Sequence, residues 1–220
     1  AEKMSGGRTC KQLFHTYHPN KFDPNNIGDK DVIYIGATTS RDVPKIMAIA
    51  SQGSSLYIYE ISPEMIQGKK GTICSGYWEL TPETGLVEGK LPVATSAYFD
   101  RMFYYAVGNK IYRADLTRST PRSYEIYAHP DPSVRITRLK FRSQREDRWD
   151  ISGGDEVEAI PYDFVSYLGG VTEYPDGNCS MLEMKLTAAG EIDKEEGTKD
   201  LMVYEFKGFK NVVDFVYAFK

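Results

Sequence analysis

Cysteine and histidine are scarce in this chain, whose 220 residues include three of each. Cys10, Cys74 and Cys179 are far apart in the sequence and form neither a Cys-x-x-Cys pair nor the Cys/His spacing of a zinc site. Three thiols can form at most one intrachain disulfide, and we expect three unpaired, mainly buried cysteines. The cysteine content therefore does not indicate a redox compartment.

Long apolar runs and an excess of one charge are also missing. No run of about 18 apolar residues is present, so the sequence predicts no transmembrane helix. Residues 1–7 are polar and lack the apolar core of a signal peptide, so any export signal or lipid anchor is expected outside this chain. The 27 Lys and Arg nearly balance the 31 Asp and Glu. This balance argues against a general nucleic-acid binder, which normally carries a strong basic excess.

Aromatic residues are plentiful, at 13% with 16 tyrosines, and this composition favours strands and turns over helices. The clearest local pattern lies at 102–116, where Gly108-Asn109 separates two apolar, strand-like runs. Gly and Asn accept the positive φ that tight hairpin turns require, so this stretch predicts a β-hairpin.

The second strand of that hairpin has two further copies, at 56–61 and 181–186. The side chains expected on the buried face are Tyr57, Tyr59 and Ile61; Tyr112, Ala114 and Leu116; Leu182, Met184 and Leu186. Each copy follows a turn signal, namely Gln52-Gly53-Ser54, Gly108-Asn109 or Pro175-Asp176-Gly177-Asn178. Each copy is also preceded and followed by another short apolar segment. The pattern therefore predicts repeated antiparallel hairpins.

The copies begin 55 and 70 residues apart, against about 40–50 for regular propeller blades, so loop insertions are expected. We predict an all-β fold with propeller-like repeats of antiparallel hairpins, about four blades that either complete the domain or belong to a larger propeller. A β-sandwich is the alternative, because its hairpins share the same alternation. The predicted organisation is an irregular N-terminal segment, 1–31, followed by one β domain, 32–220.

Four local expectations accompany this organisation. Residues 134–142 are strand-like, yet simple alternation places basic residues on both faces. The charged stretch 143–163 predicts a long loop, and 187–200 an acidic loop between the last two strands. The almost continuously apolar run 212–219 predicts a terminal strand that is buried on both faces.

Three stretches carry a resemblance to a known family: SAYFDRMFYYAVGNKIYRADL at 96–116, YAHPDPSVRITRLKFRSQRED at 127–147 and VYEFKGFKNVVDFVYAF at 203–219. They resemble the C-terminal half of PKD-like family lipoproteins of Bacteroidota. The resemblance implies an outer-membrane surface lipoprotein beside a nutrient importer and its binding lipoprotein. It also implies N-terminal PKD-like modules and a lipid anchor, which this chain lacks. It carries no catalytic or ligand-binding motif.

Several polar residues are candidate sites. His15 and His18, with Asp23, have the spacing of a metal site on a helical turn, but the surrounding Pro and Asn favour a solvated loop. Asp100-Arg101 suits an ion pair at a strand start or a polar pair that faces a channel. The third histidine, His129, lies in the turn His129-Pro-Asp-Pro132.

The remaining candidates have ordinary structural interpretations. Asp176 and Asn178 lack the full oxygen-rich loop of a calcium site and predict a turn. Asn178-Cys-Ser180 matches a glycosylation sequon, a match that often arises by chance. The basic cluster 135–148 suits an anionic ligand, but a solvated loop paired with Glu146, Asp147 and Asp150 is the default.

No Ser/His/Asp set, carboxylate-pair motif or Gly-rich phosphate loop appears, so we assign no catalytic, metal or cofactor residues. The sequence favours a non-enzymatic surface module that binds a glycan or peptide or docks on an importer. A polysaccharide hydrolase or lyase, with carboxylates in a propeller channel, is the first alternative. A purely structural scaffold is the second.

Overall fold

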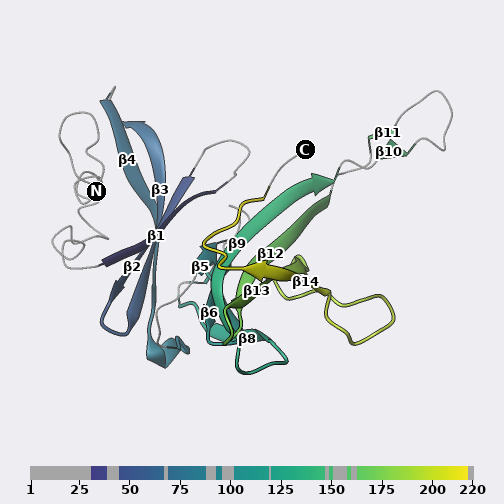
Figure 1. Cartoon of the computed structure of the whole chain (residues 1–220). Helices are drawn as coiled ribbons and strands as arrows, with labels where there is room; N and C mark the ends of the chain where they lie inside the picture. The colour runs from purple at the N-terminus through teal and green to yellow at the C-terminus, as the bar shows by residue number, and fades with distance from the viewer. Residues whose placement is uncertain are drawn as a thin grey trace. The chain divides into compact units, whose positions relative to one another are not determined.

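The structure is a computed structural model, and it is all β (Figure 1), as the sequence predicted. It describes residues 31–38, 45–66, 69–87, 93–95, 102–118, 120–146, 149–150, 158–159 and 163–217. Within these residues the strands form three four-stranded sheets and one two-stranded ribbon, and none of the sheets closes on itself. A single 3₁₀ turn, Pro82–Thr84, is the helical element described. In this part of the chain no helix has the length and apolar character needed to cross a bilayer.

Each four-stranded sheet follows the order of the chain. The first sheet contains β1 (Asp31–Thr38), β2 (Lys45–Gln52), β3 (Ser55–Ile66) and β4 (Lys69–Leu80). The second contains β5 (Val93–Thr95), β6 (Met102–Val107), β7 (Lys110–Asp115) and β8 (Ser123–Ala128). The third contains β9 (Arg135–Glu146), β12 (Asp163–Glu173), β13 (Asn178–Leu186) and β14 (Val203–Lys210). The ribbon β10 (Trp149–Asp150) and β11 (Glu158–Ala159) interrupts the third sheet between β9 and β12.

The predicted repeat matches this topology. The three sequence copies form β3, β7 and β13, and each of these is the third strand of its sheet. Each pairs with the preceding strand across a predicted turn, where Gly53, Gly108 and Gly177 have φ of 58°, 58° and 80°. The repeating unit is therefore a four-stranded meander whose central hairpin carries the recognisable sequence. An open set of such sheets is compatible with a propeller and with a sandwich.

The contacts divide the chain into two compact units, 1–89 with 114–124, and 90–113 with 125–220. In the first unit a row of large side chains crosses the first sheet, because Ile58 of β3 pairs with Ile49 of β2 and with Trp78 of β4. All three are buried. The boundary predicted at residue 31 borders the undescribed residues 1–30 and stays a prediction.

The core of the second unit joins the second and third sheets. Its buried apolar side chains are Tyr104 and Ala106 of β6, Ile111 of β7, Ile136 and Leu139 of β9, Leu168 of β12, Leu182, Met184 and Leu186 of β13, and Ile192 of the following loop. The third repeat copy was predicted correctly, since Leu182, Met184 and Leu186 all face this core. Two β-sheets thus pack through one face each, leaving the outer face of the third sheet for other contacts.

In the first repeat copy, which forms β3, the predicted buried face is only partly right. Leu56 and Ile58 are 4% and 0% exposed, whereas Tyr57, which we expected inside, is only partly buried. Tyr59 is buried as predicted, and the side chain of Ile61 lies outside the described residues. Adjacent buried residues in β3 show that both faces of this strand are covered locally, so simple alternation does not assign one buried face.

A β-bulge explains the basic residues of β9. The pairing register shifts where Val171 pairs with Arg138 and Thr172 with Ile136, so Thr137 is an extra residue in β9. The extra residue shifts the alternation of side chains by one position, so the residues after it lie on the opposite face from the one that simple alternation predicts. Ile136, Leu139 and Phe141 face the core, while Arg135, Arg138, Lys140 and Arg142 share the outer face of the third sheet. The expectation of basic residues on both faces was therefore wrong.

The prediction of a loop over 143–163 was also partly wrong. β9 continues through Glu146 and pairs with β12 up to Asp163, and the ribbon of β10 and β11 follows. The strand β9, with 12 residues, can contain many charged residues because its outer face is accessible to polar partners. The acidic stretch 187–200 does connect β13 to β14, as predicted.

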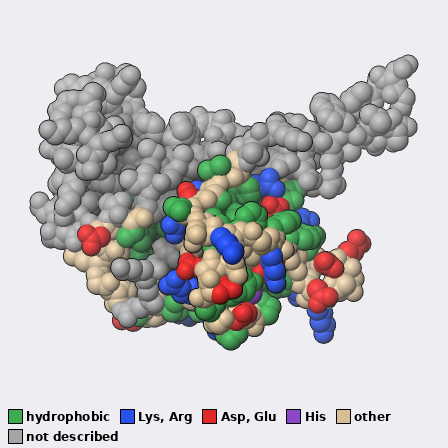
Figure 2. Space-filling view, in the orientation of Figure 1, with side chains coloured by type: hydrophobic (Ala, Val, Ile, Leu, Met, Phe, Trp, Pro, Cys, Tyr) green, Lys and Arg blue, Asp and Glu red, His purple; other side chains and the backbone are tan. Residues whose placement is uncertain are grey.

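The chain after β14 is not the predicted buried strand over 212–219. Asn211 has φ of 51°, which ends β14, and the described residues 211–217 form no strand. Val213 and Val216 are 75% and 80% exposed. Phe215 and Tyr217 instead lie against Gly169 on the outer face of the third sheet. Figure 2 shows hydrophobic and basic side chains mixed on the face of the molecule turned to the viewer.

Candidate functional site

A groove of about 880 Å³ in the second unit is the candidate site. One wall comes from the end of β8 and the loop after it, and the other from β14 and the residues just before it. The lining residues used below are Glu125, Tyr127, His129, Asp131, Tyr174, Lys199, Asp200, Glu205 and Lys207. The groove therefore combines aromatic rings with four carboxylates and two lysines.

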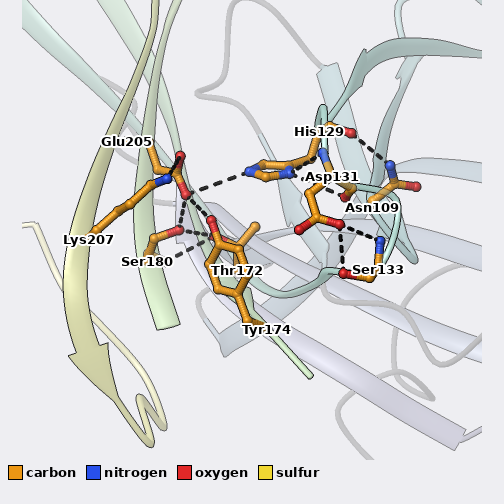
Figure 3. Close-up of polar contacts among 9 residues, drawn as sticks. All are labelled: Asn109, His129, Asp131, Ser133, Thr172, Tyr174, Ser180, Glu205 and Lys207. Carbon is orange, nitrogen blue, oxygen red and sulfur yellow. Dashed lines mark hydrogen bonds and ion pairs between the residues drawn. The ribbon is translucent and has the colours of Figure 1, made fainter. Parts of the chain in front are cut away.

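Glu205 of β14 is the most highly connected side chain of the groove (Figure 3). Its Oε1 accepts hydrogen bonds from the hydroxyls of Ser180, at 2.6 Å, and Tyr174, at 2.5 Å. His129 Nε2 is 3.6 Å from the same oxygen, and Lys207 Nζ is 3.5 Å from Oε2. Burial by itself would raise the pKa of the Glu205 carboxyl, but these hydrogen bonds and the Lys207 charge hold the pKa below its ordinary value.

Ser180 is fully buried beneath this carboxylate. Its hydroxyl also contacts the hydroxyl of Thr172, which is buried as well, and the Thr172 Oγ1 donates to the Ser180 carbonyl oxygen at 3.3 Å. The two hydroxyls of neighbouring strands therefore fix the position of Glu205 from below. A buried polar network that is satisfied in this way rigidifies the residues it joins.

His129 is held by the backbone around it. The main-chain N–H of Asp131 donates to His129 Nδ1 at 3.1 Å, and the other ring nitrogen, Nε2, is the one nearer Glu205. The His129 N–H donates to the Asn109 carbonyl oxygen, and the Asn109 side-chain amide donates to the His129 carbonyl oxygen, both at 2.9 Å. The predicted Gly108-Asn109 turn thereby anchors the histidine loop.

Two tyrosines flank His129 in edge-on contacts. The ring centroids of Tyr127 and Tyr174 are 6.5 Å and 6.2 Å from that of His129. Burial, followed by the negative charge of Glu205, raises the pKa of Tyr127 to about 12. The hydrogen bond to Glu205, followed by burial, raises the pKa of Tyr174. The floor of the groove is therefore aromatic and electrostatically negative.

The geometry does not form a nucleophile with its base. Ser180 donates to Glu205 and not to His129, and it is buried. A serine nucleophile needs the base within reach of its hydroxyl and a path to the substrate. In the described network the carboxylate lies between the serine and the histidine, so the arrangement holds the carboxylate in place.

The carboxylates also differ from a glycosidase pair. Such a pair needs one acid whose pKa is raised, so that it is protonated when the substrate binds. Hydrogen bonds from the Ser133 hydroxyl and main chain lower the pKa of Asp131, and the pKa of Glu205 is lowered too. Both carboxylates are therefore suited to accept hydrogen bonds or to meet a cation.

The sequence drew attention to His129 only as an isolated residue in a turn. The structure brings it together with Tyr174, Ser180 and Glu205, which come from other parts of the chain. Sequence reasoning missed these three as site residues. The sequence did contain one signal, namely a polar residue where an apolar one is expected. Ser180 precedes Leu182 and Met184 on one face of β13, and Glu205 lies between Tyr204 and Phe206 in β14.

Several other candidates fall outside the part of the chain that the structure describes. His15, His18, Asp23, Asp100, Arg101 and Cys10 are outside the described residues, and so is the side chain of Cys74. Asp176 caps the predicted turn, since its Oδ1 accepts from the Asn178 N–H at 3.0 Å. Cys179 is a buried free thiol, as expected. Among the residues that the structure describes, no group of three His, Cys, Asp or Glu could hold a metal.

The basic cluster is a strand face and not the expected solvated loop. Arg135 pairs with Glu173 at 3.1 Å, Lys140 with Asp214 at 2.9 Å and Arg142 with Glu183 at 3.5 Å. These partners come from β12, β13 and the segment after β14. Long-range sheet pairing thus supplies the partners of these three basic residues, while the predicted partners Glu146, Asp147 and Asp150 have side chains outside the described residues.

Comparison with known proteins found no relative. No protein-family model matches the chain, and neither a curated protein nor a solved structure matches it significantly.

Proposed function

We propose that this chain is a non-enzymatic binding module, and that the groove around Glu205 takes a glycan or peptide ligand. The observation that carries the proposal is the positioned carboxylate. Glu205 is fixed by two short hydrogen bonds below, while aromatic rings line the groove beside it. Ligand sites commonly combine aromatic walls with a few preorganised polar groups, and this groove has both.

The competing proposal is a polysaccharide hydrolase or lyase. The four carboxylates of the groove favour it, but the lowered pKa of both Glu205 and Asp131 leaves neither of them as the proton donor. Recognition requires only that these groups be ionised and correctly oriented. The electrostatics at these two carboxylates therefore support binding over hydrolysis.

For the architecture, we propose a propeller-like arrangement with the four-stranded sheets as blades. The support is that all three sheets are meanders in chain order, each with the repeat copy as its third strand. Blades of this kind normally pack face to face, as the second and third sheets do through their common core. A β-sandwich is the alternative proposal, and an experimental structure that fixes the relation of the sheets decides between them.

For the biological setting, we propose the surface of the outer membrane in Bacteroidota, next to a nutrient importer and its surface lipoprotein. The resemblance to PKD-like family lipoproteins supports this setting. Co-purification of tagged protein from outer membranes tests it. The setting is wrong if no importer component accompanies the protein while the protein stays in the soluble fraction.

A screen of oligosaccharides and peptides against the folded chain tests the binding function itself. A ligand of the groove should lose affinity in Glu205→Gln. Arg135→Gln is the control, because Arg135 is an exposed residue on the outer face of the third sheet that does not line the groove. Failure of every oligosaccharide and peptide to bind would overturn the proposal, as would a ligand whose affinity is unaffected by Glu205→Gln.

A further inference from the structure

The groove already holds a cation that belongs to the protein. Lys207 of β14 lies 3.5 Å from Glu205 Oε2. Figure 3 shows Glu205 and Asp131 on either side of Tyr174, with Lys207 beside Glu205. In this view Lys207 lies on the side of Glu205 away from Asp131, so the positive charge occupies the space beside Glu205 Oε2 and not the space between the two carboxylates.

Lys207 is weakly held there. Its side chain is 70% exposed, and an exposed ion pair is weakened by water and by the freedom of the long side chain. The side chain can swing out of the groove without loss of a buried contact. The carboxylate it leaves behind stays fixed, because Ser180 and Tyr174 bind Glu205 through the other oxygen, Oε1.

The two carboxylates each present an oxygen that the supporting bonds do not use. Ser133 binds Asp131 through Oδ1, and Ser180 and Tyr174 bind Glu205 through Oε1. Asp131 Oδ2 and Glu205 Oε2 are thus the oxygens available to a ligand. Planar donors with several N–H groups match carboxylate oxygens well, which favours a guanidinium group.

The aromatic residues suit the same ligand. Tyr127, His129 and Tyr174 form a continuous edge-on series in the groove. The face of a tyrosine ring attracts a cation, and the attraction grows when the cation loses water in a groove. Another acidic residue of the lining, Glu125, is paired with Lys110 at 2.7 Å, so it is not needed as a partner for the ligand.

We infer that the groove recognises a peptide through a basic side chain, whose cation takes the place of Lys207 beside Glu205 Oε2 and lies against the aromatic lining of Tyr127 and Tyr174. This inference rests on the proposed binding function and selects the basic peptide from the ligand classes considered there. A neutral glycan would use the rings and the hydroxyl-accepting oxygens, but it would gain nothing from displacing a lysine.

The experiment compares two peptides that differ in charge alone. Acetyl-Gly-Arg-Gly-amide and its citrulline counterpart, which keeps the shape but is neutral, are titrated into the folded chain by calorimetry or NMR. The arginine peptide should bind at least about tenfold more tightly than the citrulline peptide, since an ion pair with a positioned carboxylate is lost in the latter. Added salt should weaken the binding of the arginine peptide and leave the binding of the citrulline peptide unchanged.

Variants locate the cation. Glu205→Gln should reduce affinity for the arginine peptide about tenfold, and Lys207→Met should increase it severalfold because the competing ammonium is removed. Lys210→Met is the matched control for lost positive charge, since Lys210 is on the same strand but does not line the groove. Lys207 and Lys210 are exposed, so both variants should fold as the parent does even if Glu205→Gln does not.

The outcomes separate this inference from the binding function. Equal binding of the arginine and citrulline peptides, or an increase with Lys210→Met equal to that with Lys207→Met, overturns the inference. So does an oligosaccharide that binds in a Glu205-dependent way while the arginine peptide does not bind, although that result supports the binding function. No binding by any oligosaccharide or peptide overturns both.

Discussion

The guanidinium of Arg142 lies over the ring of Tyr217, 4.8 Å from its centroid. The same guanidinium is 4.4 Å from the centroid of the Tyr167 ring in the neighbouring strand β12. Lys140, two residues earlier on β9, pairs with Asp214 and lies 5.4 Å from the Phe215 centroid. Alternate basic residues of one strand thus hold the segment 211–217 on the third sheet without any strand pairing. Cation–π contacts of this kind contribute about 0.5–2 kcal/mol each.

Gly169 makes room for this segment, which gives a first prediction. A Cβ at Gly169 would be 2.9 Å from Phe215 Cε2 and still closer to the Tyr217 hydroxyl. Gly169→Ala should displace residues 211–217 at a cost of about 1–2 kcal/mol, because the segment forms no strand pairing and can move as a whole. Hydrogen exchange should increase in 211–217, and the melting temperature should fall slightly.

The adjacent Gly170 is the matched control for this change. A Cβ there would meet its nearest atoms at 3.5 Å, an ordinary van der Waals distance. Gly170→Ala should leave exchange in 211–217 unchanged. If both alanine variants release the segment equally, the effect comes from general disturbance of β12 and not from the space above Gly169.

The hydroxyl of Tyr217 gives a second prediction. It is buried without a hydrogen-bond partner among the described residues, and burial raises the pKa of Tyr217 well above its ordinary value. Since an unsatisfied buried hydroxyl costs free energy, Tyr217→Phe should be neutral or stabilising by up to about 1 kcal/mol. Thermal unfolding measures the change. Tyr204→Phe is the control on an exposed tyrosine and should have no effect, whereas a clear loss of stability in Tyr217→Phe would reveal a bonded hydroxyl.

Local signals in the sequence were enough to predict the sheets. The apolar runs and the turns at Gly53, Gly108 and Gly177 defined the central hairpins, because turn residues and alternation act over a few neighbours. The phase of β9 could not be predicted in this way. The bulge at Thr137 depends on the register of β12, which is determined by pairing across about 35 residues of chain.

The groove was less accessible to sequence reasoning for a related reason. His129 and Glu205 are 76 residues apart, and only the folding of the second unit brings the end of β8 and β14 to the same groove. Neither residue belongs to a spaced motif, so no local pattern pairs them. The segment 212–219 was mispredicted because its apolar residues are split between sheet contacts at Phe215 and Tyr217 and solvent at Val213 and Val216.

The Glu205 network makes stability depend on pH in acid. The folded pKa of Glu205 lies below the value of 4.5 that the carboxyl has when exposed, because Ser180, Tyr174 and Lys207 favour the ionised form more than burial opposes it. The network's contribution is therefore complete above the unfolded pKa and is lost as the pH falls through the folded pKa. Glu205→Gln cannot ionise, so it should lack this dependence.

The measurement is the melting temperature of both proteins from about pH 7 to about pH 3. The parent should be more stable at the neutral end, and the difference between the parent and Glu205→Gln should shrink as the pH falls. A difference that grows on acidification would mean that the folded state favours the protonated carboxyl, contrary to the hydrogen bonds described.

Two glycines with positive φ offer a final prediction, in which the cost of backbone conformation is separated from the cost of crowding. Gly108, with φ of 58°, has no atom within 4 Å of the place that a Cβ would take, whereas at Gly190, with φ of 76°, a Cβ would be 2.8 Å from the Tyr104 hydroxyl. That hydroxyl donates to the Gly190 carbonyl oxygen at 3.1 Å inside the core of the second unit.

Gly108→Ala should therefore cost about 1 kcal/mol, the usual penalty of a left-handed alanine, and Gly108→Asn should cost less. Gly190→Ala carries the same backbone penalty and in addition moves a buried tyrosine, so we expect a total of about 2–4 kcal/mol. Chemical denaturation of the three variants measures these differences. Equal losses at the two glycines would show that the Tyr104 contact is easily rearranged, and that the loop 187–192 does not depend on it for its position against β6.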